Sequence, residues 1–207
     1  MKEPELILFA RQPVAGEAKT RLAAHCGAVR AAEIAAFLIR ATVALAARHW
    51  PGRLALYASP NGDHPLFREL AESGLRVESQ AEGDLGMKMH SALADGIARQ
   101  GAAAVMGCDV PHCPPDLLRT AHSLLVRGGS VLGPAADGGY YLIGIQQPCK
   151  VLFEEMPWGS EVVRELTLAR ARACGIEFEL LPVLRDIDNR DDLTAAVPQV
   201  PGLSAYL

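Results

Sequence analysis

The chain has 207 residues, half of them hydrophobic and 21% charged, with a formal net charge of −4. This composition is typical of a folded α/β domain with a sizeable core, and it excludes a disordered chain. The sequence contains no basic tract and no interleaved aromatic and basic residues, which argues against nucleic acid as a partner.

Strands and helices are predicted to alternate along the first half of the chain. Residues 6–10 form a continuous apolar run of the kind found in a strand buried on both faces. Apolar residues at three- and four-residue spacing then predict a helix over about 28–48. Shorter patterns predict strands at 54–58 and 75–79, the latter at a sheet edge, and helices at 66–73 and 87–99.

The second half of the chain continues this alternation. Residues 102–107 form an apolar run that is long enough for one buried strand and too short for an ordinary helix. The elements predicted after it are a helix at 115–127, strands at 131–134 and 140–145, a helix at 161–173 and a strand at 177–181. Strands that alternate with helices predict a layered α/β sheet with right-handed crossovers. We expect a single domain over residues 1–207.

Asp109 stands just beyond the apolar run that Gly107 closes. Pro111 and two later prolines prevent the chain from turning straight back into a ladder, so Asp109 is expected at the carboxyl end of a strand. Ligands bind at this end of open parallel sheets. A lone carboxylate there is a candidate metal ligand, and the alternative is an Asp that caps the turn before the next helix.

A cationic loop follows the first strand. Arg11, Lys19 and Arg21 lie within eleven residues, beside Gly16 and shortly before a helix. Backbone amides that a ligand can approach, cations and a helix start are the combination that phosphate binding requires. The loop is not a Walker P-loop, because Ala18 stands where that motif has glycine before its lysine. The alternative is a solvated cationic loop.

A second glycine-containing loop comes directly before the helix predicted at 87–99. Gly83 and Gly86 flank Asp84 there, and the helix amino terminus is a candidate site for the polar edge of a nucleotide. The alternative is that Asp84 simply caps this helix. No Gly-x-Gly-x-x-Gly pattern follows a predicted strand, which disfavours a dinucleotide-dependent hydride-transfer enzyme.

The third loop is the run Asp137-Gly138-Gly139, which is followed by Tyr140 and Tyr141. A hairpin turn is one interpretation, because Asp-Gly is a favoured hairpin pair. The second glycine and the two aromatic residues exceed what a hairpin needs, and they suit a surface that binds a sugar or another acceptor. Asp137, Gly138, Gly139 and Tyr140 are therefore candidate acceptor-binding residues.

The fourth loop carries four carboxylates within seven residues: Asp186, Asp188, Asp191 and Asp192. Such crowding is unfavourable unless a positive charge is shared or water screens it. Asp191 and Asp192 are predicted in the opening turn of the last helix, where the helix dipole favours negative charge. Mg²⁺ or Mn²⁺ usually takes one or two carboxylates, and Asp109 with Asp188 would supply them. Whether Asp186 also binds the metal stays open.

The cysteines argue for a cytoplasmic location. There are five, scattered along the chain, which favours reduced thiols over a disulfide framework. Cys108, His112 and Cys113 lie close together, yet no second pair follows at zinc-finger spacing, which disfavours a zinc site.

The amino terminus has a short apolar run without a small-residue cleavage site, so we expect neither a signal peptide nor a membrane span.

Taken in order, these motifs resemble the GT-A (nucleotide-diphospho-sugar transferase) superfamily. The resemblance covers nearly the whole chain and implies a three-layer α/β/α fold with a mixed, mostly parallel sheet. The stretches 9–22 and 107–111 are also similar to motifs of the phospholactate guanylyltransferases. The matching stretches are residues 9–22, 83–86, 107–111, 133–144 and 186–193.

The resemblance implies a nucleotide-dependent transferase that uses Mg²⁺ or Mn²⁺, a nucleotide or nucleotide sugar, and a small-molecule acceptor. It assigns the metal to Asp109 and Asp188, and the nucleotide phosphates to the loop that contains Lys19, with its charge on the side opposite the metal. A single Asp109 stands where many glycosyltransferases have Asp-x-Asp, which favours nucleotidyl over glycosyl transfer. Two alternatives on this fold are a catalytically silent nucleotide sensor and a metal-dependent phosphohydrolase. The sequence does not predict the oligomeric state.

Overall fold

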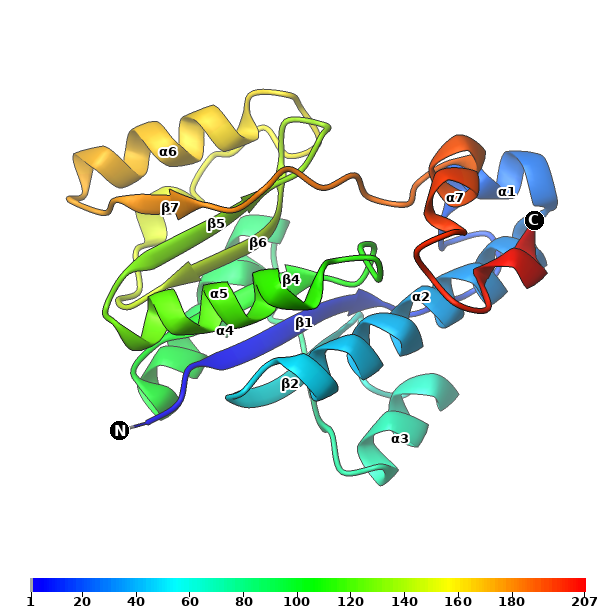
Figure 1. Cartoon of the computed structure of the whole chain (residues 1–207), viewed down its shortest axis with the longest axis horizontal. Coiled ribbons are helices and arrows are strands. Elements are labelled where there is room, and N and C mark those ends of the chain that lie inside the picture. The colour runs from blue at the N-terminus through cyan, green and yellow to red at the C-terminus, as the bar shows by residue number, and fades with distance from the viewer. Residues whose placement is uncertain (1) are drawn as a thin grey trace.

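The computed structural model describes residues 2–207 and shows one sheet between two layers of helices (Figure 1). The expected alternation of strands and helices is confirmed. Along the chain the elements are β1 (Glu5–Arg11), α1 (Thr20–Cys26), α2 (Ala28–His49), β2 (Arg53–Ser59), α3 (Pro65–Glu72), β3 (Arg76–Ser79), α4 (Leu85–Gln100), β4 (Ala103–Gly107), α5 (Pro115–Val126), β5 (Ser130–Pro134), β6 (Tyr140–Ile145), the 3₁₀ turn η1 (Lys150–Leu152), α6 (Val163–Ala173), β7 (Phe178–Leu180), α7 (Arg190–Ala196) and the 3₁₀ turn η2 (Leu203–Tyr206).

The sheet is mixed and mostly parallel, as expected, with the strand order β3-β2-β1-β4-β6-β5-β7. β1 lies parallel to both β2 and β4. Leu6, Ile7, Leu8 and Ala10 of β1 are buried because helices cover both faces of the sheet at its centre. β6 alone runs antiparallel to its two neighbours, β4 and β5. The carboxyl ends of β1, β2, β3 and β4 therefore meet at one edge of the sheet.

The two faces of the sheet carry separate hydrophobic cores, which confirms the three-layer architecture. Neighbouring residues of β1 point to opposite faces, so Leu6 and Leu8 join one core and Ile7 joins the other. The first core takes residues from α2, α3 and α5, and the second takes residues from α4, α6 and η1. Each helical layer thus covers a face that water would otherwise reach.

A third cluster joins the two ends of the chain. Leu22 of α1 and Leu38 of α2 pack with Ile187, Leu193 of α7 and Leu203 of η2. Figure 1 shows α1, α7 and the carboxyl terminus gathered at one end of the molecule. This cluster brings the residue before α1, which is Lys19, to the segment that precedes α7.

Helix α1 differs from the sequence-based prediction, which placed a loop and then a helix only from residue 28. The chain forms a seven-residue helix from Thr20 to Cys26, and Gly27, with φ 81°, separates it from α2. A helix this short is marginal on its own. Leu22, which is buried in the third cluster, provides the tertiary packing that a local pattern does not reveal.

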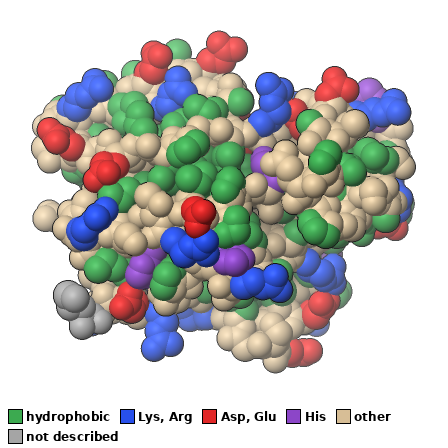
Figure 2. All heavy atoms as spheres, viewed as in Figure 1, with side chains coloured by type: hydrophobic (Ala, Val, Ile, Leu, Met, Phe, Trp, Pro, Cys, Tyr) green, Lys and Arg blue, Asp and Glu red, His purple; other side chains and the backbone are tan. Residues whose placement is uncertain are grey.

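Charged side chains of both signs are interspersed over the face shown in Figure 2. Among the helices of residues 2–207, none combines the length and the apolar character needed to cross a membrane.

Candidate functional site

The predicted cationic and acidic residues meet at the edge of the sheet where the parallel strands end. A cavity of about 610 Å³ opens there. It lies beside the last residues of β1 and the loop after β4, which is the usual ligand position in open α/β sheets. The predicted site residues that line it are Arg11, Lys19, Arg21, Asp109, Asp137 and Asp188.

The centre of this site is the ammonium group of Lys19. Its Nζ lies 2.8 Å from Asp109 Oδ1 and 2.8 Å from Asp188 Oδ1. It also donates a hydrogen bond to the carbonyl oxygen of Ile187, at 2.7 Å. An ammonium group has three N–H donors, so each donor has an acceptor. Two aspartates from distant parts of the chain therefore share one cation.

Backbone contacts hold these groups in register. The amide of Ile187 donates to the carbonyl oxygen of Asp109 at 3.0 Å, which ties the segment before α7 to the end of β4. The Ile187 side chain is fully buried in the third cluster. Lys19 itself adopts a left-handed backbone conformation, with φ 48°, at the start of α1. The fold thus fixes all three partners of the ammonium.

Burial and charge act in opposite directions on Lys19. The side chain is only 9% exposed, and burial alone would lower its pKa. The neighbouring carboxylates of Asp109 and Asp188 outweigh this effect, so the pKa of Lys19 is raised above its usual value. Lys19 is therefore a stable cation at neutral pH.

Asp186 is a further carboxyl group of the same region. Its Oδ1 is buried and has no hydrogen-bond partner among residues 2–207. Burial and, to a lesser extent, the negative charges of Asp109, Asp137 and Asp188 together raise the pKa of Asp186 to about 7. Four carboxyl groups thus contribute to one acidic region around the Lys19 ammonium.

Asp191 and Asp192 open α7, as predicted. Asn189 accepts hydrogen bonds from the amides of both residues, at 2.9 and 3.0 Å. The Asp192 carboxylate accepts from the amide of Asn189 in return, which completes a capping box. The carboxylates of this pair therefore stabilise a helix start, and Asp188 is left to face the cavity.

Asp109 and Asp188 fit a divalent cation, because both already direct an oxygen to one cationic centre. The two side chains are 46% and 38% exposed, so a ligand can reach them. Within the described residues, no group of three His, Cys, Asp or Glu side chains forms a ready-made metal site. Two carboxylates, completed by water and phosphate oxygens, are a common set for Mg²⁺.

The position of Lys19 differs from the expectation that its charge lies on the side opposite the metal. Its ammonium sits between the two aspartates instead. The physical reason is burial: a charge that is nine-tenths removed from water needs counter-charges within hydrogen-bond distance. Among the nearby cations, Arg21 is 78% exposed, with its guanidinium 3.8 Å from Asp188 Oδ2, and Arg11 is also exposed.

The loop after β1 also borders a second cavity, of about 700 Å³. Phe9, Arg11 and Glu17 line both cavities, so the two adjoin along this loop. Other lining residues come from the ends of β2 and β3 and the start of α4: Ser59, Pro60, Gln80, Leu85 and Lys88. Sequence analysis did not assign these residues to a site. Ser59 and Gln80 directly follow the strands predicted at 54–58 and 75–79, and this position could have placed them at the ligand-binding edge of the sheet.

The glycines before α4 have local structural roles. Gly83 adopts φ 107°, and a Cβ added to Gly86 would lie 2.4 Å from the carbonyl oxygen of Phe153. Asp84 accepts a hydrogen bond from the amide of Met87 at 2.8 Å, so the helix-cap interpretation of Asp84 is confirmed. Neither Gly83, Gly86 nor Gly16 lines the cavity around Lys19 in the described structure, and their nucleotide-binding role stays a prediction.

Residues 135–139 connect the antiparallel strands β5 and β6, so the hairpin interpretation of this stretch is confirmed. Asp137 lines the cavity, and its Oδ1 accepts a hydrogen bond from the amide of Gly139 at 2.9 Å. The carbonyl oxygen of Gly138 accepts from the amide of Arg164 at 2.9 Å. The first turn of α6 therefore packs directly on the turn at 137–139.

Tyr140 does not reach the cavity. Its hydroxyl oxygen is buried, and its ring packs edge-on against Trp158 in the core beneath α4 and α6. Strand alternation explains this position, because Tyr140 points to the face opposite that of Tyr141, which is buried in the first core. The structure thus places the half-buried Tyr140 and Trp158 against the second core, away from the cavity around Lys19.

Replacing Gly138 with alanine is expected to destabilise the protein by about 3 kcal/mol, because the residue adopts φ 90° and the new Cβ would lie 2.2 Å from the carbonyl oxygen of Glu161. Gly175→Ala is the matched control: its φ is 71°, and no described atom lies within 4 Å of an added Cβ. We expect this control to cost about 1 kcal/mol. Urea unfolding measures both, and equal losses would contradict the packing role of Gly138.

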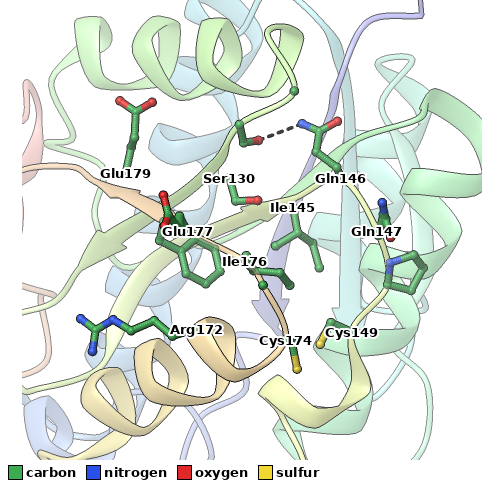
Figure 3. A pocket seen from close by; sticks show the side chains of 15 residues that line it. Ser130, Ile145, Gln146, Gln147, Cys149, Arg172, Cys174, Ile176, Glu177 and Glu179 are labelled. Atoms are coloured by element: carbon green, nitrogen blue, oxygen red, sulfur yellow. Dashed lines mark hydrogen bonds between the residues drawn. The ribbon is translucent and has the colours of Figure 1, made fainter.

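A further cavity, of about 860 Å³, lies at the opposite edge of the sheet. Figure 3 shows it between the end of β6, the start of β5 and the turn that joins α6 to β7, with Gln146 and Arg172 among its lining residues. Gln146 donates a hydrogen bond to the carbonyl oxygen of Gly129 at 2.9 Å. None of the predicted site residues lines it in the described structure, so its size does not identify the functional site.

The fold is that of the nucleotide-diphospho-sugar transferases. A protein from Desulfovibrio desulfuricans G20, provisionally named a nucleotide-diphospho-sugar transferase, superposes with a TM-score of 0.84 and 26% identity, over 100% of this chain and 94% of that chain. The inositol-1-phosphate CTP transferase from T. maritima gives 0.60 at 16% identity, over 100% and 97%. Rv0371c from Mycobacterium tuberculosis H37Rv, in complex with manganese, gives 0.51 at 15%, over 97% and 100%. The last two show the fold alone.

The chain belongs to the family described as "Uncharacterized protein conserved in bacteria (DUF2064)", whose profile matches residues 42–160. This range contains Asp109 and the turn at 137–139 and ends before Asp188. No curated protein matches the chain. Together with the Desulfovibrio structure, these comparisons confirm the resemblance to the nucleotide-diphospho-sugar transferase superfamily and the expectation of a nucleotide-dependent transferase.

Proposed function

We propose that this protein is a metal-dependent nucleotidyltransferase that joins a nucleotide to a small-molecule acceptor. The observation that carries the proposal is the convergence of Asp109 and Asp188 on one buried cation at the carboxyl ends of the central strands. Glycosyl transfer from a nucleotide sugar is the second candidate, favoured by the name of the Desulfovibrio protein.

Asp109 and Asp188 would hold Mg²⁺ or Mn²⁺. When bound, such an ion neutralises charge on phosphate oxygens and orients them. The cations of this chain supply further positive charge to the nucleotide phosphates: Lys19 lines the cavity, and Arg11 and Arg21 are exposed at its rim. Fixed charge of this kind stabilises the charge that develops during transfer.

The turn at 137–139 borders the same cavity and is the candidate surface for the acceptor. Its role would be to place an acceptor oxygen in line with the bond that breaks, because positioning supplies much of the rate enhancement in such reactions. An oxygen that attacks phosphorus forms a new phosphate ester and releases pyrophosphate. An oxygen that attacks the anomeric carbon of a sugar forms a glycosidic bond and releases a nucleoside diphosphate.

Product analysis tests the proposal. The protein is incubated with Mg²⁺ or Mn²⁺, a panel of small hydroxyl and phosphate acceptors, and in turn each nucleoside triphosphate, UDP-sugar and GDP-sugar. Release of pyrophosphate supports nucleotidyl transfer, and release of a nucleoside diphosphate supports the glycosyl alternative. Free phosphate would indicate a phosphohydrolase, and binding without turnover a nucleotide sensor; either result would overturn the proposal.

A thermal-shift panel selects the nucleotide before the assay. A ligand that binds only the folded state at 100 times its dissociation constant stabilises the protein by about 2.7 kcal/mol. We expect the correct nucleotide to raise the melting temperature in the presence of Mn²⁺ and to raise it far less in EDTA.

A further inference from the structure

The hydrogen bonds of Lys19 make its ammonium an internal substitute for a metal ion. Two of its three acceptors are oxygens of the candidate metal ligands, Asp109 and Asp188. The third is the backbone carbonyl oxygen of Ile187, the residue next to Asp188. The group is therefore fully satisfied without any phosphate. In this arrangement Lys19 keeps two like charges together that would otherwise repel each other.

The same arrangement leaves no place for a divalent cation between the two Oδ1 atoms while Lys19 stays there. The ammonium occupies the point on which the two Oδ1 atoms converge, and a second cation within a few ångströms would be strongly repelled in this poorly solvated place. Either the carboxylates bind the metal through their other oxygens with the ammonium alongside, or Lys19 leaves. Repulsion between the ammonium and the divalent cation favours the departure of Lys19.

The cavity beside Lys19 offers its ammonium an alternative position. Its side chain lines the 610 Å³ cavity, which is where the proposed function places the nucleotide phosphates. A phosphate group there would replace the two carboxylates as the partner of the Lys19 ammonium. The ammonium needs such a partner because an unpaired charge is unfavourable in a buried position. The other charged side chains that line this cavity in the described structure are Arg11, Glu17, Arg21, Asp137 and Glu161. The carboxyl group of Asp186 also lies close enough to feel the charge of Lys19.

We propose that Lys19 is an exchangeable counter-ion, which holds Asp109 and Asp188 together in the ligand-free protein and moves to the nucleotide phosphates when a divalent cation binds. The inference rests on the proposed function and specifies how its site is regulated. It follows that metal alone binds weakly, because it must displace Lys19 from two carboxylates. Triphosphate alone binds weakly for the same reason, and the two ligands together bind cooperatively.

The first test measures Mn²⁺ binding without nucleotide, from the loss of the electron paramagnetic resonance signal of free Mn²⁺. Lys19→Met keeps an unbranched side chain that is one atom shorter and removes the charge. We expect it to bind Mn²⁺ about tenfold more tightly than the wild-type protein, or better, because no cation has to be displaced. Lys150→Met, at an exposed lysine that pairs with Glu154, is the matched control and should leave Mn²⁺ affinity unchanged.

The second test uses the wild-type chain and does not depend on the folding of a variant. Acetylation by acetic anhydride is quantified by mass spectrometry at Lys19 and at Lys150, with and without saturating Mn²⁺. Buried between two carboxylates, Lys19 should react slowly in EDTA and severalfold faster with Mn²⁺, while Lys150 should react equally in both. Added triphosphate should protect Lys19 again.

The outcomes separate this inference from the proposed function. If Mn²⁺ binds in an Asp109-dependent manner while Lys19 stays unreactive and Lys19→Met gains no affinity, the exchange is wrong and the transferase proposal stands. If neither the wild-type protein nor Lys19→Met binds Mn²⁺ even with nucleotide present, both the exchange and the proposed function are wrong. Tighter Mn²⁺ binding by Lys19→Met, or metal-dependent acetylation of Lys19, supports the exchange.

Discussion

Replacing Asp109 with alanine is expected to abolish metal-dependent nucleotide binding while the protein stays folded. The variant loses one of the two carboxylates that converge on the cation, and an interaction of this kind contributes several kcal/mol, so we expect a loss of about 100-fold or more in the metal-dependent affinity. The side chain is 46% exposed, and the backbone carbonyl that accepts from Ile187 remains, so the fold should tolerate the change. Isothermal titration with a triphosphate, in Mg²⁺ and in EDTA, measures the effect.

The metal-independent part of the binding should respond differently. Without Asp109, the ammonium of Lys19 keeps only one carboxylate partner, Asp188, so it loses less when it binds a phosphate. Triphosphate affinity in EDTA should therefore persist or rise. Asp95→Ala, at an exposed aspartate of α4, is the control and should behave like the wild type. If Asp109→Ala retains the full difference between Mg²⁺ and EDTA, the metal site lies elsewhere.

Most of the fold could be predicted from local patterns. The apolar runs at 6–10 and 102–107 are the central strands β1 and β4, because a continuous apolar run is typical of a strand with both faces covered. The prolines after Asp109 placed that carboxylate at the ligand-binding edge, and the structure confirms the position. Helix α1 was missed because its single buried residue, Leu22, packs on distant segments and leaves no periodic signal.

The arrangement inside the site could be predicted only in part. Residue types and loop positions identified Lys19, Asp109 and Asp188 as members of one site, but spacing along the chain carries no information on which side of an aspartate a lysine lies. That detail depends on the third hydrophobic cluster, which joins α1 to the segment before α7. Sequence analysis likewise assigned Tyr140 to the acceptor surface, whereas strand alternation directs its ring to the second core, against which it is half-buried.

Replacing Asp186 with asparagine is expected to stabilise the metal-free protein, and more at pH 8 than at pH 5. Burial raises the pKa of Asp186 from its ordinary value of 3.8 to about 7. Between these values the folded state binds a proton that the unfolded state has lost, so stability falls as the pH rises towards 7 and stays low above it. The full penalty corresponds to roughly 4 kcal/mol at most, and asparagine carries no charge at either pH.

Urea unfolding in EDTA at pH 5 and pH 8 measures the difference. At pH 5 the wild-type carboxyl is largely protonated when folded, so only part of the penalty is present and the gain from Asp186→Asn should be small. At pH 8 the buried carboxylate faces Asp109, Asp137 and Asp188 with its Oδ1 unpartnered, and the gain should be largest. Asp191→Asn, on the exposed first turn of α7, is the matched control and should change stability equally at both pH values. An equal gain from Asp186→Asn at pH 5 and pH 8 would mean that this carboxyl group titrates normally, and the acidic region would then be less crowded than the structure shows.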